Sequence, residues 1–366
     1  MARTALFVCF LALLVPFNGK AGAAQSPPPD ATEIFGAVRK APLRDGIDAE
    51  QMVRIGGIDQ WISVRGRHKS APLLLFLHGG PGFTSIPTSY FFMSGWDEYF
   101  TVAQWEQRGA GKTFKANGEE LIRPTMSIGR MIADAEEVIT YLRSTYRQPK
   151  IVLVGHSWGT VLGATLAQRH PDWFYVYVGM AQFVDFQKSE AAGYEATLAA
   201  ARKAHDPGAV AELEALAPFP DSKHPERNLQ NLETERHWLD KFGGSVWLGS
   251  EDQYDAVGKL SPDYTYEERV ERNRGLKFGL QILWGPLSTF SLLGKNHFGC
   301  PVVFMHGRHD LVTNASVLNQ WYEKLDAPNK KLVWFEDSSH LVYEEEPGKT
   351  LVTLVGDVLP FARAAH

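Results

Sequence analysis

Cysteine is nearly absent from this chain of 366 residues, which contains only Cys9 and Cys300. Cys9 lies in an N-terminal apolar stretch that we expect to be removed, and this would leave a single thiol. One thiol forms no internal disulfide, and the cysteine and histidine residues do not cluster with the spacing of metal ligands. The sequence therefore predicts neither a disulfide framework nor a metal site.

Long runs of lysine or arginine are also missing. The chain has 37 basic and 42 acidic side chains, which give it a net charge of −5. Binding to nucleic acid through its phosphates depends on a basic patch, so we expect no nucleic-acid partner. Hydrophobic residues make up 44% of the chain, a composition typical of a globular protein of enzyme size.

The apolar stretch near the N-terminus, residues 5–17, is too short to span a membrane. A helix of this length, at ~1.5 Å per residue, falls short of the ~30 Å hydrocarbon core. Arg3 precedes it and small residues follow it, an order typical of a cleaved secretory signal peptide. We predict a signal peptide at residues 1–24, followed by a proline-rich leader at 25–48. The protein would then be secreted or periplasmic, with no stable membrane association after cleavage; an uncleaved amphipathic anchor is the alternative.

Short β-rich runs alternate with helical patterns from Met52 onward. The strand-like runs are residues 61–64, 73–77, 100–105, 151–154 and 174–180, and residues 126–146 have a helical pattern. Strands that alternate with helices indicate a parallel sheet with helices on both faces. The sequence therefore predicts an α/β fold.

The pattern changes in the middle of the chain, where helical segments rich in Ala, Glu and Arg replace the strands. Strand signals return at residues 300–305 and 331–335. We predict one α/β core interrupted by an all-helical cap. The predicted core is residues 49–185 and 297–366, and the predicted cap is residues 186–296.

Residues 155–159 read GHSWG, which has the form G-x-S-x-G. They directly follow the apolar run 151–154 and precede a helical segment. Glycines on either side let a strand turn sharply into a helix and leave Ser157 exposed above the sheet. The pattern alone is weak evidence, because a glycine-rich turn with an idle serine would look the same.

Two later strand ends supply the partners that a serine nucleophile needs. A serine hydroxyl needs a base to take its proton, and the base needs an acid to orient it. Asp310 follows the run 302–305 and His340 follows the run 332–335, which gives the chain order serine, acid, histidine. We predict Ser157 as the nucleophile, His340 as the base and Asp310 as the orienting acid.

Some of these residues have alternative interpretations. Asp310 could instead cap a helix that starts near Val312, and Asp185 is a second candidate for the acid. His306 and His309 flank Asp310, but no carboxylates accompany them at ligand spacing. We interpret both histidines as loop and packing residues.

The segment HGGPG at residues 78–82 follows the apolar run 73–77 and predicts an oxyanion loop. Acyl transfer needs two donors for the negative oxygen of its intermediate. One donor is the backbone N–H after the nucleophile, on Trp158, and the other comes from the glycine loop. Pro81 can fix a tight turn there through a cis bond.

Three segments together resemble a known family. They are HGGPG at 78–82, WEQRGAGKT at 105–113 and GHSWG at 155–159. The chain resembles the proline iminopeptidase branch of the α/β-hydrolases, serine aminopeptidases with a helical cap. The resemblance covers about residues 52–180 and 300–340.

The resemblance implies an α/β-hydrolase fold, in which a mostly parallel sheet is flanked by helices and carries an inserted helical cap. It implies a triad of Ser157, Asp310 and His340. It also implies oxyanion donors on the backbone of Gly80 and Trp158, and a base of the site shaped by residues 107–109.

The sequence departs from the family pattern at two positions, with Glu106 in place of the usual Asp and His156 in place of the usual Gly. Family members bind the substrate's amino group through acidic residues of the cap. The candidates here are Glu233, Glu235, Asp240, Glu251 and Asp252, beside the aromatic residues Trp238 and Trp247. We predict Gly79, Glu233, Glu235 and Trp238 as substrate-binding residues.

These residues predict acyl transfer without a cofactor, in which a serine attacks a carbonyl and water hydrolyses the acyl-enzyme. We predict a serine aminopeptidase of proline iminopeptidase type, whose partners are small molecules or short peptides. An exported carboxylesterase or lactonase on the same residues is the alternative, and a non-catalytic binding protein is a third hypothesis. The sequence assigns no oligomeric state.

Overall fold

The computed structural model describes residues 30–39 and 45–364. The predicted signal peptide at 1–24 and Cys9 lie outside the described residues. The leader predicted at 25–48 is described in part, and it contains a helix, α1 (Ala31–Arg39), and the start of the first strand. In the described part of the chain, no helix is long and apolar enough to cross a membrane.

The centre of the molecule is one sheet of eight strands in the order β1-β2-β4-β3-β5-β6-β7-β8. β1 and β2 form an antiparallel hairpin that pairs antiparallel with β4, and every other pairing is parallel. This confirms the predicted mostly parallel sheet. The strands are β1 (Ile47–Ile55), β2 (Ile58–Gly66), β3 (Leu73–Leu77), β4 (Thr101–Trp105), β5 (Ile151–His156), β6 (Phe174–Met180), β7 (Val302–Gly307) and β8 (Lys330–Phe335).

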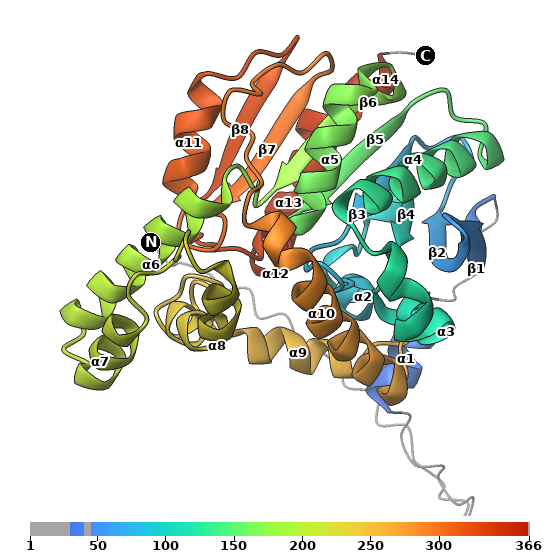
Figure 1. Cartoon of the computed structure of the whole chain (residues 1–366). Coiled ribbons are helices and arrows are strands. Elements are labelled where there is room, and N and C mark those ends of the chain that lie inside the picture. Colours follow the sequence, from blue (N-terminus) through green and yellow to red (C-terminus); the bar gives the residue numbers. More distant parts are fainter. Residues whose placement is uncertain (1–29, 40–44, 365–366) are drawn as a thin grey trace, which may run out of the picture.

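Helices cover both faces of the sheet, so the inner strands β3 to β7 are buried along their whole length and are mostly apolar. Along β3, the alternate residues Leu73, Leu75 and Leu77 join one buried cluster, and Leu74 and Phe76 join the other. The first face is covered by α3 (Gly111–Ile122), α4 (Ile128–Thr145), α5 (Trp158–Arg169) and α11 (Ala315–Glu323). The second face is covered by α2 (Ile86–Phe92), α12 (Val342–Glu345), α13 (Pro347–Thr353) and α14 (Leu359–Arg363) (Figure 1).

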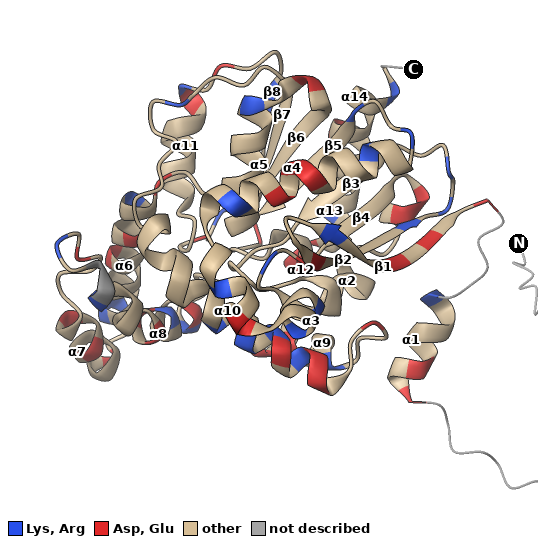
Figure 2. Ribbon diagram, turned by 45° about the vertical axis from the view of Figure 1, so that its right-hand side comes forward, with Lys and Arg blue, Asp and Glu red and all other residues tan. Residues whose placement is uncertain are grey.

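The region between β6 and β7 folds into helices that gather at one end of the sheet (Figure 1). They are α6 (Phe186–Lys203), α7 (Pro207–Ala215), α8 (Pro225–Lys241), α9 (Glu251–Lys259) and α10 (Tyr266–Leu287). Part of this cap has its own small core, which includes Tyr194, Leu213, Phe219 and Trp238. Figure 2 shows basic and acidic residues interspersed along α8 and α9.

Helix α10 approaches the core backbone to backbone. A Cβ atom at Gly82 would lie 2.6 Å from the carbonyl oxygen of Gly275, and one at Gly279 would lie 2.7 Å from that of Pro81. Gly275 likewise has no room for a side chain against the carbonyl of Gly109. These glycines therefore let α10 rest directly on the loops that follow β3 and β4.

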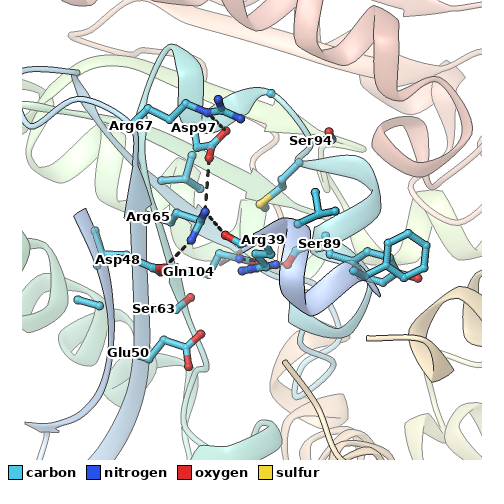
Figure 3. A pocket seen from close by; sticks show the side chains of 18 residues that line it. Arg39, Asp48, Glu50, Ser63, Arg65, Arg67, Ser89, Ser94, Asp97 and Gln104 are labelled. Atoms are coloured by element: carbon cyan, nitrogen blue, oxygen red, sulfur yellow. Dashed lines mark hydrogen bonds and ion pairs between the residues drawn. The ribbon is translucent and has the colours of Figure 1, made fainter. Parts of the chain in front are cut away.

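Helix α1 contacts both the core and the cap. The Phe35 ring lies 5.0 Å from that of Tyr90 on α2, and Arg39 pairs with Asp263, just before α10, at 2.6 Å. Arg65 of β2 donates to the Arg39 carbonyl and pairs with acidic side chains of the core (Figure 3). Between α1, α2 and the β1-β2 hairpin lies a cavity of about 170 Å³ (Figure 3).

Candidate active site

Ser157 lies between β5 and α5 in a strained backbone conformation, with φ 51° and ψ −121°. A Cβ atom at Gly155 would lie 2.7 Å from the carbonyl of Gly159, and one at Gly159 would lie 2.8 Å from that of His78. The two glycines therefore allow a turn too tight for any side chain at these positions. This is the geometry predicted from the GHSWG segment, and it leaves the serine hydroxyl facing a cavity.

Ser157, His340 and Asp310 come together although they are far apart in the sequence. His340 Nε2 lies 2.9 Å from the hydroxyl of Ser157, and His340 Nδ1 lies 3.0 Å from a carboxylate oxygen of Asp310. Asp310 follows β7 and His340 follows β8, so the carboxyl ends of three parallel strands supply the three side chains. Such a chain of hydrogen bonds can move a proton from the hydroxyl to the imidazole.

The carboxylate of Asp310 is buried and fully hydrogen-bonded. It accepts from the backbone N–H groups of Val312 at 2.9 Å and Thr313 at 2.8 Å, and from the Thr313 hydroxyl at 2.6 Å. Burial acts to raise its pKa, but the charge of His340 and these hydrogen bonds outweigh burial, and the pKa is lowered. Asp310 therefore stays ionised and can hold His340 in one orientation.

The alternative roles of the acids are resolved by their contacts. Asp185 caps α6 by accepting from the N–H of Lys188 at 2.9 Å. Helix α11 begins at Ala315 with Asn314 as its cap, so Asp310 does not cap it. Asp310, and not Asp185, therefore faces the imidazole of His340.

The two histidines beside Asp310 have different surroundings. His306 is buried, and burial lowers its pKa to about 4, so its ring is neutral near pH 7. Its Nε2 atom lies 3.6 Å from a carboxylate oxygen of Asp310. His309 stacks on Trp247 with 3.4 Å between ring centroids. Among the described residues, no group of three or more His, Cys, Asp or Glu side chains is arranged to hold a metal ion.

The glycines after β3 bring backbone close to the serine. A Cβ atom at Gly79 would lie 3.4 Å from Cβ of Ser157, and Gly80 has φ 114°, a value that favours glycine. The Gly80–Pro81 bond is cis. The N–H of Trp158 begins α5, where helix N–H groups lack partners within the helix. Gly80 and Trp158 both line the cavity beside Ser157.

Gln107 joins the two sides of this oxyanion region. Its side-chain oxygen accepts from the Trp158 indole at 2.9 Å, and its amide nitrogen donates to the His78 carbonyl at 3.0 Å. Its backbone N–H also donates to His78 Nε2 at 3.2 Å. One buried side chain therefore fixes the glycine loop relative to the first turn of α5.

His156 and Glu106, the two departures from the family pattern, are both buried. His156 lies 3.1 Å from the His340 carbonyl and 3.3 Å from the Tyr343 hydroxyl, so it supports the loop that carries His340. Glu106 accepts from the N–H of Lys112 and from the hydroxyl of Tyr264, just before α10, and burial raises its pKa to about 7. Glu106 thus connects the core to the cap.

The hydroxyl of Ser157 opens into a cavity of about 470 Å³ between the core and the cap. Its lining contains both apolar and charged side chains. The apolar residues include Phe183, Phe186, Leu232, Leu276, Leu280, Trp284 and Leu287, and the charged ones are Glu190, Arg236, Glu251, Asp252, Asp255, Arg272 and Glu344.

Glu190 lines the cavity and has one carboxylate oxygen without a hydrogen-bond partner in the described residues. It lies on α6 one turn after Phe186, whose ring meets that of Trp284 edge-on at 5.0 Å. One oxygen of Glu190 accepts from Arg236 at 2.5 Å, and the other is buried with no hydrogen-bond partner in the described part of the chain. The carboxylate is therefore held in place with one oxygen left without a partner.

The predicted substrate-binding residues lie in different places. Gly79 lines the cavity. Glu233 is exposed on α8, whereas Glu235 is buried and forms an ion pair with Arg236. Trp238 donates to Glu212 at 2.9 Å and packs into the small core of the cap. The structure thus places these three α8 residues outside the cavity lining, whereas the sequence predicted that they bind the substrate.

The remaining acidic candidates of the cap also differ in position. The other candidates Glu251 and Asp252 line the cavity, whereas Asp240 does not. Glu190, Arg236, Arg272 and Glu344 line it and were not predicted, since nothing in an amphipathic helical pattern distinguishes them.

Comparison with known proteins agrees with this geometry. The family described as alpha/beta hydrolase fold matches residues 72–347. A probable aminopeptidase of Bacillus subtilis (strain 168) is 30% identical over 316 residues, which are 86% of this chain and 97% of that protein. A probable proline iminopeptidase of Leptolyngbya boryana is 25% identical over 288 residues, which are 74% of this chain and 82% of that one. The solved structure of a proline iminopeptidase from Mycobacterium smegmatis has a TM-score of 0.64 at 16% identity, covering 87% of this chain and all of that one (100%).

Proposed function

The chain belongs to the α/β-hydrolase fold family, in its proline iminopeptidase-like branch, and we propose that it is a serine aminopeptidase acting on short peptides. The observation that carries this proposal is the chain of hydrogen bonds from Ser157 to His340, at 2.9 Å, and from His340 to Asp310, at 3.0 Å. Ser157 and His340 line a cavity between the core and the cap. The similarity to aminopeptidases supports the proposal that this protein is a hydrolase, and the geometry of the site supports the proposal that a serine is its nucleophile.

In the proposed reaction, the Ser157 hydroxyl attacks the carbonyl carbon of the first peptide bond while His340 Nε2 takes its proton. Asp310 stabilises the imidazolium through Nδ1–H. The backbone N–H groups of Gly80 and Trp158 bind the oxyanion, and each such donor typically contributes ~3 to 4 kcal/mol to the transition state. His340 then protonates the leaving amine, and water releases the acyl group by the same route.

Glu190 makes this site suited to a substrate with a free amino group. Its unpartnered oxygen can accept from an ammonium group, and the ring pair of Phe186 and Trp284 can pack against an apolar first side chain. Arg236 holds this carboxylate in place through an ion pair at 2.5 Å. The cap closes over the cavity, which favours short peptides over folded proteins.

The proposal is tested by comparing an aminoacyl anilide such as that of proline, its N-acetyl derivative, and a simple aryl ester. An aminopeptidase hydrolyses the free anilide and loses most activity when the amine is acetylated, because Glu190 then lacks its ammonium partner. Turnover of the ester alone, or equal turnover of the acetylated and free anilides, would instead support the second candidate, a carboxylesterase or lactonase. The apolar side chains in the cavity lining support that candidate, because they suit an acyl chain.

We also propose that the protein is exported through the N-terminal signal predicted at residues 1–24. Sequencing the N-terminus of the protein recovered from the periplasm or the medium should find a start near residue 25. Recovery of a full-length chain from a membrane fraction would favour the uncleaved anchor.

A further inference from the structure

We propose that Arg272 binds a carboxylate group of the substrate, so that the enzyme prefers short peptides with a free C-terminus. This inference rests on the proposed function for the identity of the substrate. It adds a second recognition site to the cavity, at some distance from the amine site at Glu190, and assigns it an anionic ligand.

Arg272 is a buried cation without an acidic partner. It lies on α10, lines the catalytic cavity and is only 6% exposed. Its Nε–H donates to the carbonyl of Thr84 at 2.9 Å, and its guanidinium carbon lies 3.4 Å from the centre of the Phe83 ring. In the described residues, no Asp or Glu oxygen lies within 4.0 Å of it, and its two terminal nitrogens have no hydrogen-bond acceptor.

Another buried arginine in the same molecule shows what Arg272 lacks. Arg108 donates to both oxygens of Asp134, at 2.7 and 3.2 Å, and to the carbonyl of Gly56. A buried guanidinium is costly unless a carboxylate compensates it, and its planar shape suits two parallel hydrogen bonds to one carboxylate. Arg272 stacks on the Phe83 ring and donates one hydrogen bond to Thr84, as in such a site, but it has no carboxylate partner among the residues that the structure describes. A carboxylate of a ligand would fill that position.

The placement of Arg272 along α10 fits the end of a short peptide. Arg272, Leu276, Leu280 and Trp284 follow one another at four-residue steps and all line the cavity. At ~1.5 Å per residue, the first and last of these are about 18 Å apart along the helix. Glu190 lies at the Trp284 end. After allowing for the length of the arginine side chain, the separation matches a peptide of roughly two to four residues at ~3.3 to 3.6 Å each.

Two carboxylates near this part of the cavity, Glu344 and Asp255, act on the charge of Arg272, but neither forms an ion pair with it. Glu251, Asp252 and Asp255 of α9 are exposed at its rim, where water screens them. Glu344 is buried, and burial raises its pKa to about 7, so near neutral pH much of it is protonated and can itself donate to a carboxylate. Arg272 is therefore the principal interior charge at this end.

The test compares kcat/KM for a dipeptide such as prolyl-alanine with that for its C-terminal amide. The wild-type enzyme should prefer the free acid by about 10- to 100-fold, because an amide leaves the buried guanidinium unpaired. Arg272→Gln should bring the ratio close to one, and Arg272→Lys should keep part of the preference. Arg274→Gln is the matched control, since Arg274 is exposed on the same helix and pairs with Glu271.

The ratio separates recognition from folding, because a partly misfolded variant loses activity on both peptides alike. Equal turnover of acid and amide by the wild-type enzyme, or an unchanged ratio in Arg272→Gln, would overturn the inference. If neither peptide is hydrolysed, the aminopeptidase proposal fails, and Arg272 is then tested with an aryl hemisuccinate and its methyl ester. A preference for the hemisuccinate that Arg272→Gln abolishes would retain the carboxylate site, and no preference would reject it.

Discussion

In the core, the side chains that act on the reacting bond already have their partners, whereas in the cap two buried charged groups face the cavity with free atoms. Asp310 accepts three hydrogen bonds besides the one to His340. Glu190 has an oxygen without a partner, and Arg272 has no acidic neighbour within 4.0 Å among the described residues. The core is arranged for chemistry before substrate arrives, and the cap is arranged to bind it.

The largest effect expected from this comparison is on the nucleophile. Ser157→Ala should lower kcat/KM for a proline anilide by at least about 10⁴-fold, because no other group in the site can form the acyl-enzyme. A fluorophosphonate probe should label the wild-type protein and not the variant. Labelling or substantial activity that survives in Ser157→Ala would contradict the assignment of the chemistry to the core.

The next effect concerns Glu106, which joins the core to the cap through Tyr264. Burial raises the pKa of Glu106 to about 7 from an ordinary 4.5, so the folded state binds more protons than the unfolded state between these values. Its contribution to stability therefore decreases as pH rises from about 4.5 to 7, by roughly 3 kcal/mol at ~1.4 kcal/mol per pKa unit.

Denaturant unfolding of the wild type and of Glu106→Gln across this pH range measures that contribution. The glutamine variant cannot ionise, so its free energy of unfolding should decrease less with pH than that of the wild type. Parallel curves for the two proteins would show that Glu106 does not titrate in this range.

A smaller effect is expected on recognition in the cap. Glu190→Gln should lower kcat/KM for the free anilide by about 10- to 100-fold, the range for a lost charged hydrogen bond, and change aryl ester hydrolysis much less. Glu195→Gln, an exposed position on the same helix, is the matched control. If Glu233→Gln or Glu235→Gln weakened anilide hydrolysis more than Glu190→Gln, the assignment of residues made from the sequence would be the better one.

The smallest effect tests the contact between α1 and the cap. Arg39→Ala removes its ion pair with Asp263 and should reduce the free energy of unfolding by about 1 kcal/mol or less, since the pair is partly exposed. Thermal unfolding measures this effect. A loss of several kcal/mol would mean that α1 secures the cap far more strongly than its contacts indicate.

The core could be predicted from the sequence because local rules determine it. The strands predicted at residues 73–77 and 174–180 have the same bounds as β3 and β6 in the structure. Chain order and strand ends located Asp310 and His340, since parallel strands bring their carboxyl ends to one edge. Backbone restrictions on glycine located the turn at Ser157.

The cap could not be predicted in the same way. Its helices are recognisable, but periodicity gives only the apolar side of a helix and not the neighbour that it meets. Glu233 and Glu235 are separated by about 200° around α8, so one is exposed and the other is buried beside Arg236. Helix α1 was missed because its contacts with Tyr90 and the cap are distant in sequence.

The glycine contacts of α10 also determine how a substrate reaches the serine. Because Gly275 and Gly279 rest on the backbone of the loops after β3 and β4, this helix cannot swing outward without separating two closely packed surfaces. We expect substrate to enter and product to leave the cavity beside α9. The acidic side chains Glu251, Asp252 and Asp255 of this helix would attract the positively charged N-terminus of a peptide. Amide hydrogen exchange should then be slow along α10 and fast along α9.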